Sequence, residues 1–144
     1  MPLLRNGQWT NEDSIESLLL IDLPQYAEMS TAQRALVSGV LINPSDDIQA
    51  LTECLETLEL VIISFPKYTD GRGYSHARIL RTQMGYTGEI RASGDIRADQ
   101  LLFMIRAGIN TFNFETVQDE RQVQEVLTRY ETNYQPSYAL PNAG

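Results

Sequence analysis

Short apolar runs alternate with amphipathic stretches along most of this chain. The apolar runs predict buried strands over residues 18–21, 40–42, 60–64 and 111–114. Residues 89–93 alternate polar and apolar side chains, which predicts a strand with one face against the core. Between these strands, apolar residues recur at helical spacing and predict helices over about 30–38, 43–58, 75–84, 95–107 and 119–130.

Start and stop signals support these helices. Ser30 and Gln33 form a capping-box pattern, and Asp95 is placed to cap the helix that follows it. Gly85 and Gly108 stand where a left-handed residue ends a helix. The helix over 43–58 is expected to bury one face, formed by Ile48, Leu51, Leu55 and Leu58.

The chain begins with a hairpin signal. Asn6 and Gly7 stand between short flanks that contain apolar residues, a sequence typical of a two-residue β-turn. We therefore predict a small β-hairpin at the start of the fold.

The order of elements predicts an α/β fold with parallel strands in successive βα units, joined by right-handed crossovers. Two architectures fit this order. One is an open doubly wound sheet, and the other is part of a (βα)-barrel that a second subunit could complete. We expect a single α/β domain over residues 1–132 and an extended C-terminal tail over 133–144, and a homo-oligomer fits the barrel alternative.

Composition narrows the classes of partner. The net charge of −8 argues against a nucleic-acid partner, and no apolar run approaches the roughly 20 residues that span a bilayer. We expect a cytoplasmic protein without a membrane partner. The single cysteine, Cys54, excludes an internal disulfide and any cysteine-only metal centre within one chain, so no metal site is predicted.

Charge is unevenly distributed. Residues 67–106 carry seven basic and four acidic side chains, a local charge of +3, whereas the rest of the chain carries −11. This pattern favours a focused anion site or a docking face for an acidic partner. Three of the arginines in this region, Arg78, Arg81 and Arg97, are expected to lie on solvated helix faces.

The strongest candidate site is the turn between the strand over 60–64 and the next helix. Two glycines let the backbone approach an anion, amides at the helix start can donate to it, and two cations supply charge. The predicted anion- or partner-binding residues here are Lys67, Asp70, Gly71, Arg72, Gly73, Tyr74 and Ser75.

Three residues of the following strand and its exit, Arg91, Ser93 and Asp95, join the candidate site because ligands bind at the carboxyl ends of parallel strands. Arg91 has two readings. It either meets a ligand or forms an ion pair with a carboxylate such as Glu89 or Asp70. His76 is expected near the solvent margin of its helix, and no residue is assigned a catalytic role.

The sequence contains only part of a nucleotide fingerprint. Gly71, Arg72 and Gly73 give half of a Gly-x-Gly-x-x-Gly turn, and the sequence contains neither a haem-attachment motif nor a cysteine cluster. We therefore predict that the chain binds no cofactor.

Three segments, 65–75 (FPKYTDGRGYS), 85–92 (GYTGEIRA) and 99–101 (DQL), carry a family resemblance. Together they resemble a bacterial family commonly labelled probable oxidoreductase of sulfite reduction, whose members are typically encoded beside sulfite reductase. The resemblance implies a place in sulfur assimilation and sulfite reductase as a partner. Members of this family often carry a cysteine near the position of Gly108, where this chain has Ala107, so a catalytic thiol is not expected there.

These observations leave more than one function open. The first is an accessory protein of assimilatory sulfite reduction that binds an oxyanion or the reductase through the cationic glycine-rich turn. The alternatives are a small barrel-like enzyme that acts on an anionic substrate, an oxidoreductase as the family label suggests, and a structural oligomer without a ligand.

Overall fold

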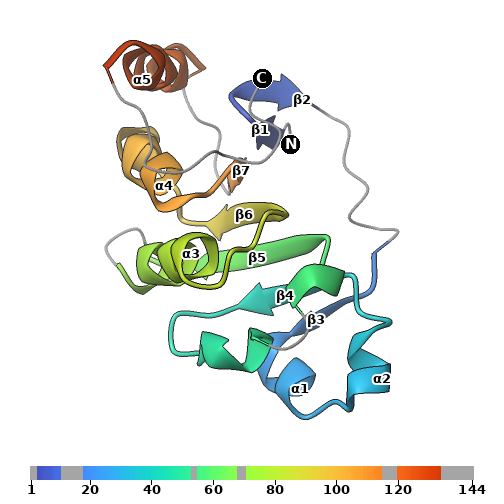
Figure 1. Ribbon diagram of the computed structural model, residues 1–144. Helices are drawn as coiled ribbons and strands as arrows, with labels where there is room; N and C mark the ends of the chain where they lie inside the picture. Colours follow the sequence, from blue (N-terminus) through green and yellow to red (C-terminus); the bar gives the residue numbers. More distant parts are fainter. Residues whose placement is uncertain (1–2, 11–17, 53–54, 68–70, 115–119, 134–144) are drawn as a thin grey trace.

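The computed structural model describes residues 3–10, 18–52, 55–67, 71–114 and 120–133. Its strands form one open sheet in the order β2-β1-β7-β6-β5-β4-β3 (Figure 1). The strands are β1 (Leu3–Arg5), β2 (Gln8–Thr10), β3 (Leu20–Asp22), β4 (Gly39–Ile42), β5 (Leu60–Phe65), β6 (Glu89–Gly94) and β7 (Thr111–Phe114). The α/β class predicted from the sequence is confirmed.

Strands β3 to β7 are parallel and lie side by side in chain order. The sheet is open, as one of the two expected architectures requires. Its strand order does not reverse part of the way across, as the order of a doubly wound sheet does. Strands that follow one another in chain order are typical of a (βα)-barrel. Among the described residues the sheet does not close, and β2 and β3 are its two edge strands. Strand β5 lies inside the sheet and pairs in parallel on both sides, as expected of a parallel sheet.

Helices follow the strands. The α-helices are α1 (Leu23–Ala27), α2 (Thr31–Arg34), α3 (Arg72–Thr82), α4 (Leu101–Ala107) and α5 (Glu120–Asn133), and the 3-10 segments are η2 (Ile48–Leu51), η3 (Leu55–Thr57) and η4 (Ala98–Gln100). Helix α4 packs between α3 and α5, and Figure 1 shows the three stacked along one side of the sheet. Right-handed crossovers between strands in sequential order bring the helices to one face in this way.

The main core lies between this sheet face and the helices. Val61, Ile63 and Phe65 of β5 belong to one buried cluster with Leu80 of α3 and Met104 of α4. Because side chains alternate along a strand, Leu60 and Ile62 point to the opposite face. We call that opposite face the second face of the sheet.

The predicted N-terminal hairpin is confirmed. Strands β1 and β2 pair antiparallel, and both turn residues have positive φ, 50° at Asn6 and 83° at Gly7. The hairpin joins the parallel strands because β1 pairs antiparallel with β7. The amide of Asn6 also donates to the carbonyl oxygen of Asn110 at 2.8 Å, which fixes the turn against the start of β7.

The segment expected to form one helix over 43–58 differs from that prediction. Its described residues form two short 3-10 segments, η2 and η3, although the four apolar residues expected on the buried face are all buried. The carboxylate of Asp47 accepts the amide of Gln49, two residues on, at 3.0 Å. That local bond competes with the regular helical pattern and favours a tighter first turn.

The capping box at Ser30 and Gln33 is confirmed, with both reciprocal hydrogen bonds present. The helix is shorter than expected, since α2 ends at Arg34, and Gly39 belongs to β4 instead of ending the helix. A Cβ at position 39 would stand 2.9 Å from the carbonyl oxygen of Leu60, so the glycine allows a close approach of two strands.

Two further boundaries are corrected. The first parallel strand begins at Leu20 and lies at the sheet edge, so Leu19 is 51% exposed instead of buried. Asp95 does not cap the helix predicted after it, because Arg97 is the N-cap of η4 and α4 follows directly. The expected stop at Gly108 is confirmed by its φ of 108°.

Helix α5 ends at Asn133, and the rest of the expected C-terminal tail lies outside the described residues. Among the described residues, no helix has both the length and the apolar character needed to cross a bilayer.

Candidate functional site

Phe65 brings the start of α3 and the end of β6 together at the carboxyl edge of the sheet. Its ring meets that of Tyr74 edge-on, with centroids 5.5 Å apart. Gly73 lies so close to this ring that a Cβ there would stand 2.5 Å from it. The carbonyl oxygen of Phe65 accepts the amide of Asp95 at 2.8 Å. Three of the predicted site residues are therefore held by Phe65, Gly73 and Tyr74 against its ring and Asp95 at its carbonyl oxygen.

Within the described residues, helix α3 begins without a side-chain cap. Gly71 is its N-cap residue and makes no side-chain hydrogen bond to the first turn, because glycine has no side chain. Arg72 and Ser75 in the first turn are exposed, as is Lys67 at the end of β5. The amide end of a helix attracts negative charge, and two cations flank this one in sequence. Asp70, also predicted here, lies outside the described residues.

Tyr74 links the start of α3 to the segment after β6. Its hydroxyl donates to Oε1 of Gln100 at 3.3 Å. Burial raises the pKa of this hydroxyl, and the negative charge of Asp99 raises it further. The phenol therefore stays protonated at neutral pH and serves this edge as a neutral donor.

Asp95 is engaged locally. Its Oδ1 lies 3.4 Å from Nε of Arg97, a half-exposed cation two residues on. The carboxyl edge thus carries both signs of charge near α3.

Arg91 lies apart from this turn. Arg91 pairs with Ile62 of β5, which lies three residues before Phe65. About 10 Å of strand therefore separates Arg91 from the carboxyl edge of the sheet. Its side chain lies on the second face and is only 3% exposed. Glu89 Oε2 accepts from Arg91 Nη2 at 2.9 Å and from Nε at 3.2 Å. Of the two readings of Arg91, the ion pair with Glu89 is present.

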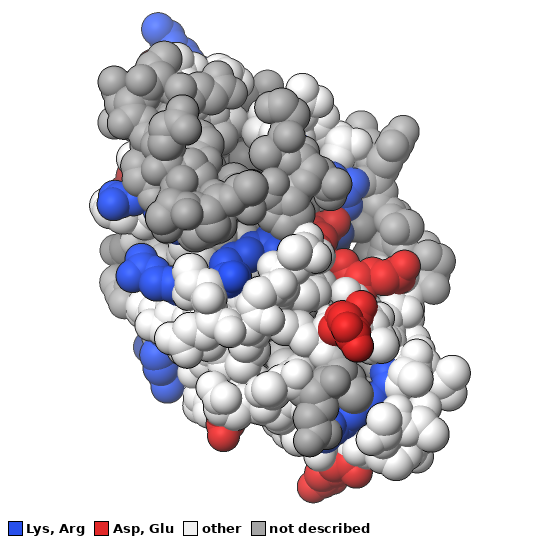
Figure 2. All heavy atoms as spheres, in the orientation of Figure 1, with Lys and Arg blue, Asp and Glu red and all other residues white. Residues whose placement is uncertain are grey.

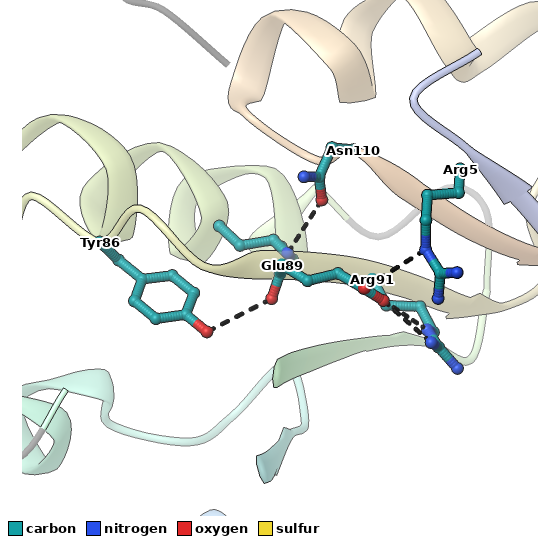
Figure 3. A network of polar contacts seen from close by, with 6 residues as sticks. Arg5, Tyr86, Glu89, Arg91 and Asn110 are labelled. Carbon is teal, nitrogen blue, oxygen red and sulfur yellow. Dashed lines mark hydrogen bonds and ion pairs between the residues drawn. The ribbon is translucent and has the colours of Figure 1, made fainter. Parts of the chain in front are cut away.

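Glu89 also faces a second cation. Its Oε1 lies 3.4 Å from Nε of Arg5 in β1, so one carboxylate contacts arginines from β6 and β1 (Figure 3). The same view shows Asn110, whose Oδ1 accepts the amide of Ile90 at 3.0 Å. These contacts fasten the start of β6 to β1 and to the residue that precedes β7.

Ser93 shares the second face with Arg91, two residues nearer the carboxyl edge. It pairs with Ser64 of β5 on one side and with Asn113 of β7 on the other. The three polar side chains therefore form a row across the sheet. Ser64 and Ser93 are half-buried, whereas Asn113 is exposed.

The expectation for Arg81 is wrong. Instead of lying on a solvated helix face, Arg81 is buried, and it donates to the carbonyl oxygens of Gly108, Tyr86 and Gly88 at 2.9, 2.8 and 2.8 Å. With Arg91 also buried, two of the seven cations between residues 67 and 106 serve internal contacts. Figure 2 shows the described basic side chains at several separate places on its face instead of in one continuous patch.

His76 is half-buried, and its Nε2 lies 3.1 Å from the carbonyl oxygen of Pro44, which joins α3 to the loop after β4. In that loop Asp46 accepts the amide of Asn43 at 2.8 Å. Within the described part of the chain, no three histidine, cysteine or carboxylate side chains gather as metal ligands would.

Sequence reasoning named Glu89 as one possible partner of Arg91, but it missed Arg5 and Thr111 as neighbours. Thr111 pairs with Arg91 in β6 and with Arg5 in β1. The alternation in residues 89–93 indicated that Glu89 shares a face with Arg91. The proximity of Arg5 depends on β1 pairing with β7, which no local pattern encodes.

Comparison with known proteins places the chain by family. No curated protein matches it. Residues 39–143, which include β4 to β7 and the candidate turn, match a family described as bacterial protein of unknown function (DUF934). The chain therefore belongs to this bacterial family, DUF934.

Proposed function

We propose that this protein is an accessory of sulfite reduction that binds an oxyanion group at the start of α3. The group is either a small free anion or an acidic group on the reductase, since both present the same acceptor oxygens. The observation that carries the proposal is the start of α3 beside Phe65. There the N-cap residue Gly71 provides no side-chain cap for the first-turn amides, and Arg72 in the same turn is exposed.

Three features support this location. Helix α3 has eleven residues, long enough for its dipole to act at the first turn. The contacts of Phe65 with Gly73 and Tyr74 fix the helix start, so the amides are oriented before a ligand arrives. The position also agrees with the general placement of ligands at the carboxyl ends of parallel strands.

The pathway is supported by the resemblance of segments 65–75, 85–92 and 99–101 to proteins encoded beside sulfite reductase. The same segments contain the candidate turn. The same residues therefore support both a role in sulfite reduction and a binding role for this turn.

The experiment compares Arg72→Ala with Arg78→Ala. Both remove one exposed arginine from α3, but only Arg72 lies in its first turn. Binding of sulfite, sulfate and phosphate is measured by calorimetry at constant ionic strength, and binding of purified sulfite reductase is measured in a separate arm. Losing a charge-assisted contact of about 1.5–3 kcal/mol should weaken binding roughly 10- to 150-fold in Arg72→Ala.

Arg78→Ala should bind as the wild type does. Binding of the free anions identifies a small ligand, and binding of the reductase alone identifies an acidic group of the partner. Equal binding by the two variants in both arms would overturn the proposal.

A further inference from the structure

The second face of the sheet carries another row of polar side chains, formed by Arg91, Thr111 and Arg5, which is separate from the turn before α3. Thr111 of β7 lies directly between Arg91 of β6 and Arg5 of β1 in the strand register. Paired residues of neighbouring strands project from the same face with their Cβ atoms about 5 Å apart. The hydroxyl-bearing residue is therefore flanked on both sides by an arginine.

Thr111 has a buried hydroxyl that no group among the described residues satisfies. Its side chain is completely buried, and in the described part of the chain Oγ1 has no hydrogen-bond partner. Native proteins leave few buried polar atoms unpaired, because an unmet hydrogen bond in the interior costs free energy. A hydroxyl kept in this state beside two arginines points to a bound acceptor.

Glu89 orients the cations of this row. Its two carboxylate oxygens contact Arg91 and Arg5, at 2.9 Å from Nη2 of Arg91 and 3.4 Å from Nε of Arg5. Figure 3 shows both side chains converging on that carboxylate. Guanidinium groups and a hydroxyl are donors, and a planar guanidinium suits an oxyanion better than a neutral ligand.

Exposure increases along this face toward the carboxyl edge. Thr111 is completely buried and Arg91 nearly so, whereas Ser93 is half-buried and Asn113 is exposed one row further along. Two residues of strand separate the rows by about 7 Å. A ligand that reaches Thr111 from this edge passes Ser93 and must be small.

We propose that Thr111, Arg91 and Arg5 form a second binding site, for a small inorganic oxyanion, on the face of the sheet opposite the helices. Thr111 donates its hydroxyl to the anion, the two arginines supply charge, and Glu89 is a positioning residue that holds them. This site is independent of the one proposed at the start of α3, because it uses different strands and the other face.

The test replaces the Thr111 hydroxyl by a methyl group of the same shape, in Thr111→Val. The full chain is titrated with sulfate, sulfite and phosphate by calorimetry, and its melting temperature is measured in each salt against chloride at equal ionic strength. A ligand that binds only the folded state raises that temperature. Wild type should bind at least one of the anions, and the binding at this second-face site should be at least about tenfold weaker in Thr111→Val.

Arg72→Ala separates this site from the one at α3. The Arg72→Ala variant should retain the anion-dependent stabilisation that Thr111→Val loses. If Arg72→Ala abolishes the whole effect and Thr111→Val none of it, or if no anion stabilises the wild type, the proposal is overturned.

A second measurement does not depend on any variant. In wild-type protein labelled with ¹⁵N, titration with the same anion should shift the backbone amide of Thr111 and the side-chain Nε–H of Arg91. The amide of Asn133, at the far end of α5, serves as the reference. Unchanged signals from Thr111 and Arg91 at saturating anion would also overturn the proposal.

Discussion

Arg81 donates from Nε to the carbonyl oxygen of Gly108 at 2.9 Å, which ties the last turn of α3 to the residue that ends α4. The same guanidinium bonds Tyr86 and Gly88 in the loop before β6. One buried cation therefore holds the two loops that lead into β6 and β7. In barrel-like winding this amino-terminal end of the strands contributes stability, and ligands bind at the opposite end.

Replacing Arg81 should destabilise the fold without touching either proposed site. Arg81→Met would leave three carbonyl oxygens without this donor, and we expect a loss of about 3 kcal/mol in the free energy of unfolding. Arg78→Met, on the exposed side of the same helix, should change it by less than about 0.5 kcal/mol. Urea denaturation followed by circular dichroism measures both, and similar losses would contradict the internal role of Arg81.

Position 94 requires a residue without a side chain. Its φ is +116°, and a Cβ there would stand 2.5 Å from the carbonyl oxygen of Phe65. Gly94→Ala should therefore lower the free energy of unfolding by at least about 2 kcal/mol. Gly71→Ala is the matched control, because its φ is −83° and nothing stands within 4 Å of the added Cβ. Thermal unfolding that gives both variants the same melting temperature would show that position 94 tolerates a side chain.

Asn110 should control the opening of β6 at its first residues. Its Oδ1 accepts the buried amide of Ile90, a contact that Asn110→Ala removes. We expect faster hydrogen exchange at the Ile90 amide, by roughly 10-fold for each 1.4 kcal/mol of lost local stability. Asn113→Ala, at an exposed position of β7, should leave that rate unchanged. Exchange at Ile90 that is the same in both variants would assign the protection to the strand ladder alone.

Tyr86 should make the fold sensitive to alkali. Burial raises the pKa of its hydroxyl well above the ordinary value of 10.0, an effect that Arg81 partly opposes. At a pH between the ordinary pKa and the raised pKa, the hydroxyl is ionised in the unfolded chain and protonated in the folded chain. Stability is therefore fully present below about pH 10 and falls above it, by at most about 1.4 kcal/mol per pH unit for this group.

Tyr86→Phe removes that dependence together with the hydrogen bond to the carbonyl oxygen of Leu58 at 3.1 Å. The variant should be less stable at neutral pH by about 1 kcal/mol, and its stability should decline less steeply above pH 10. Denaturant melts at pH 8, 10 and 11 compare the two slopes. Parallel slopes would mean that Tyr86 ionises in the folded state as readily as in the unfolded chain.

The elements that sequence predicted correctly depend on neighbouring residues. Asn6 and Gly7 specify their turn through their own φ angles, and Ser30 and Gln33 form their capping box across three residues. The parallel strands were recognised because apolar runs such as residues 60–65 must be covered on both faces.

The missed features depend on residues that are distant in sequence. The carbonyl partners of Arg81 come from two separate loops, the more distant 27 residues away, so its sequence context resembled that of an exposed helix residue. The row of Arg91, Thr111 and Arg5 requires the register of three strands at once. For the same reason the candidate site was predicted as one group of residues, whereas Arg91 and Ser93 face away from the helix-covered side.

The pairing of β1 with β7 sets an order of events during synthesis. Leu4 pairs with Phe112, so the first strand of this sheet leaves the ribosome about 100 residues before its partner in β7. At typical rates of translation that delay is on the order of 5–20 s. During this interval β3 to β6 can add to one another as they emerge, whereas β1 and β2 remain a two-stranded hairpin, which is marginally stable alone. The part of the second face around Thr111 is therefore assembled last, once β7 brings this residue between the two arginines.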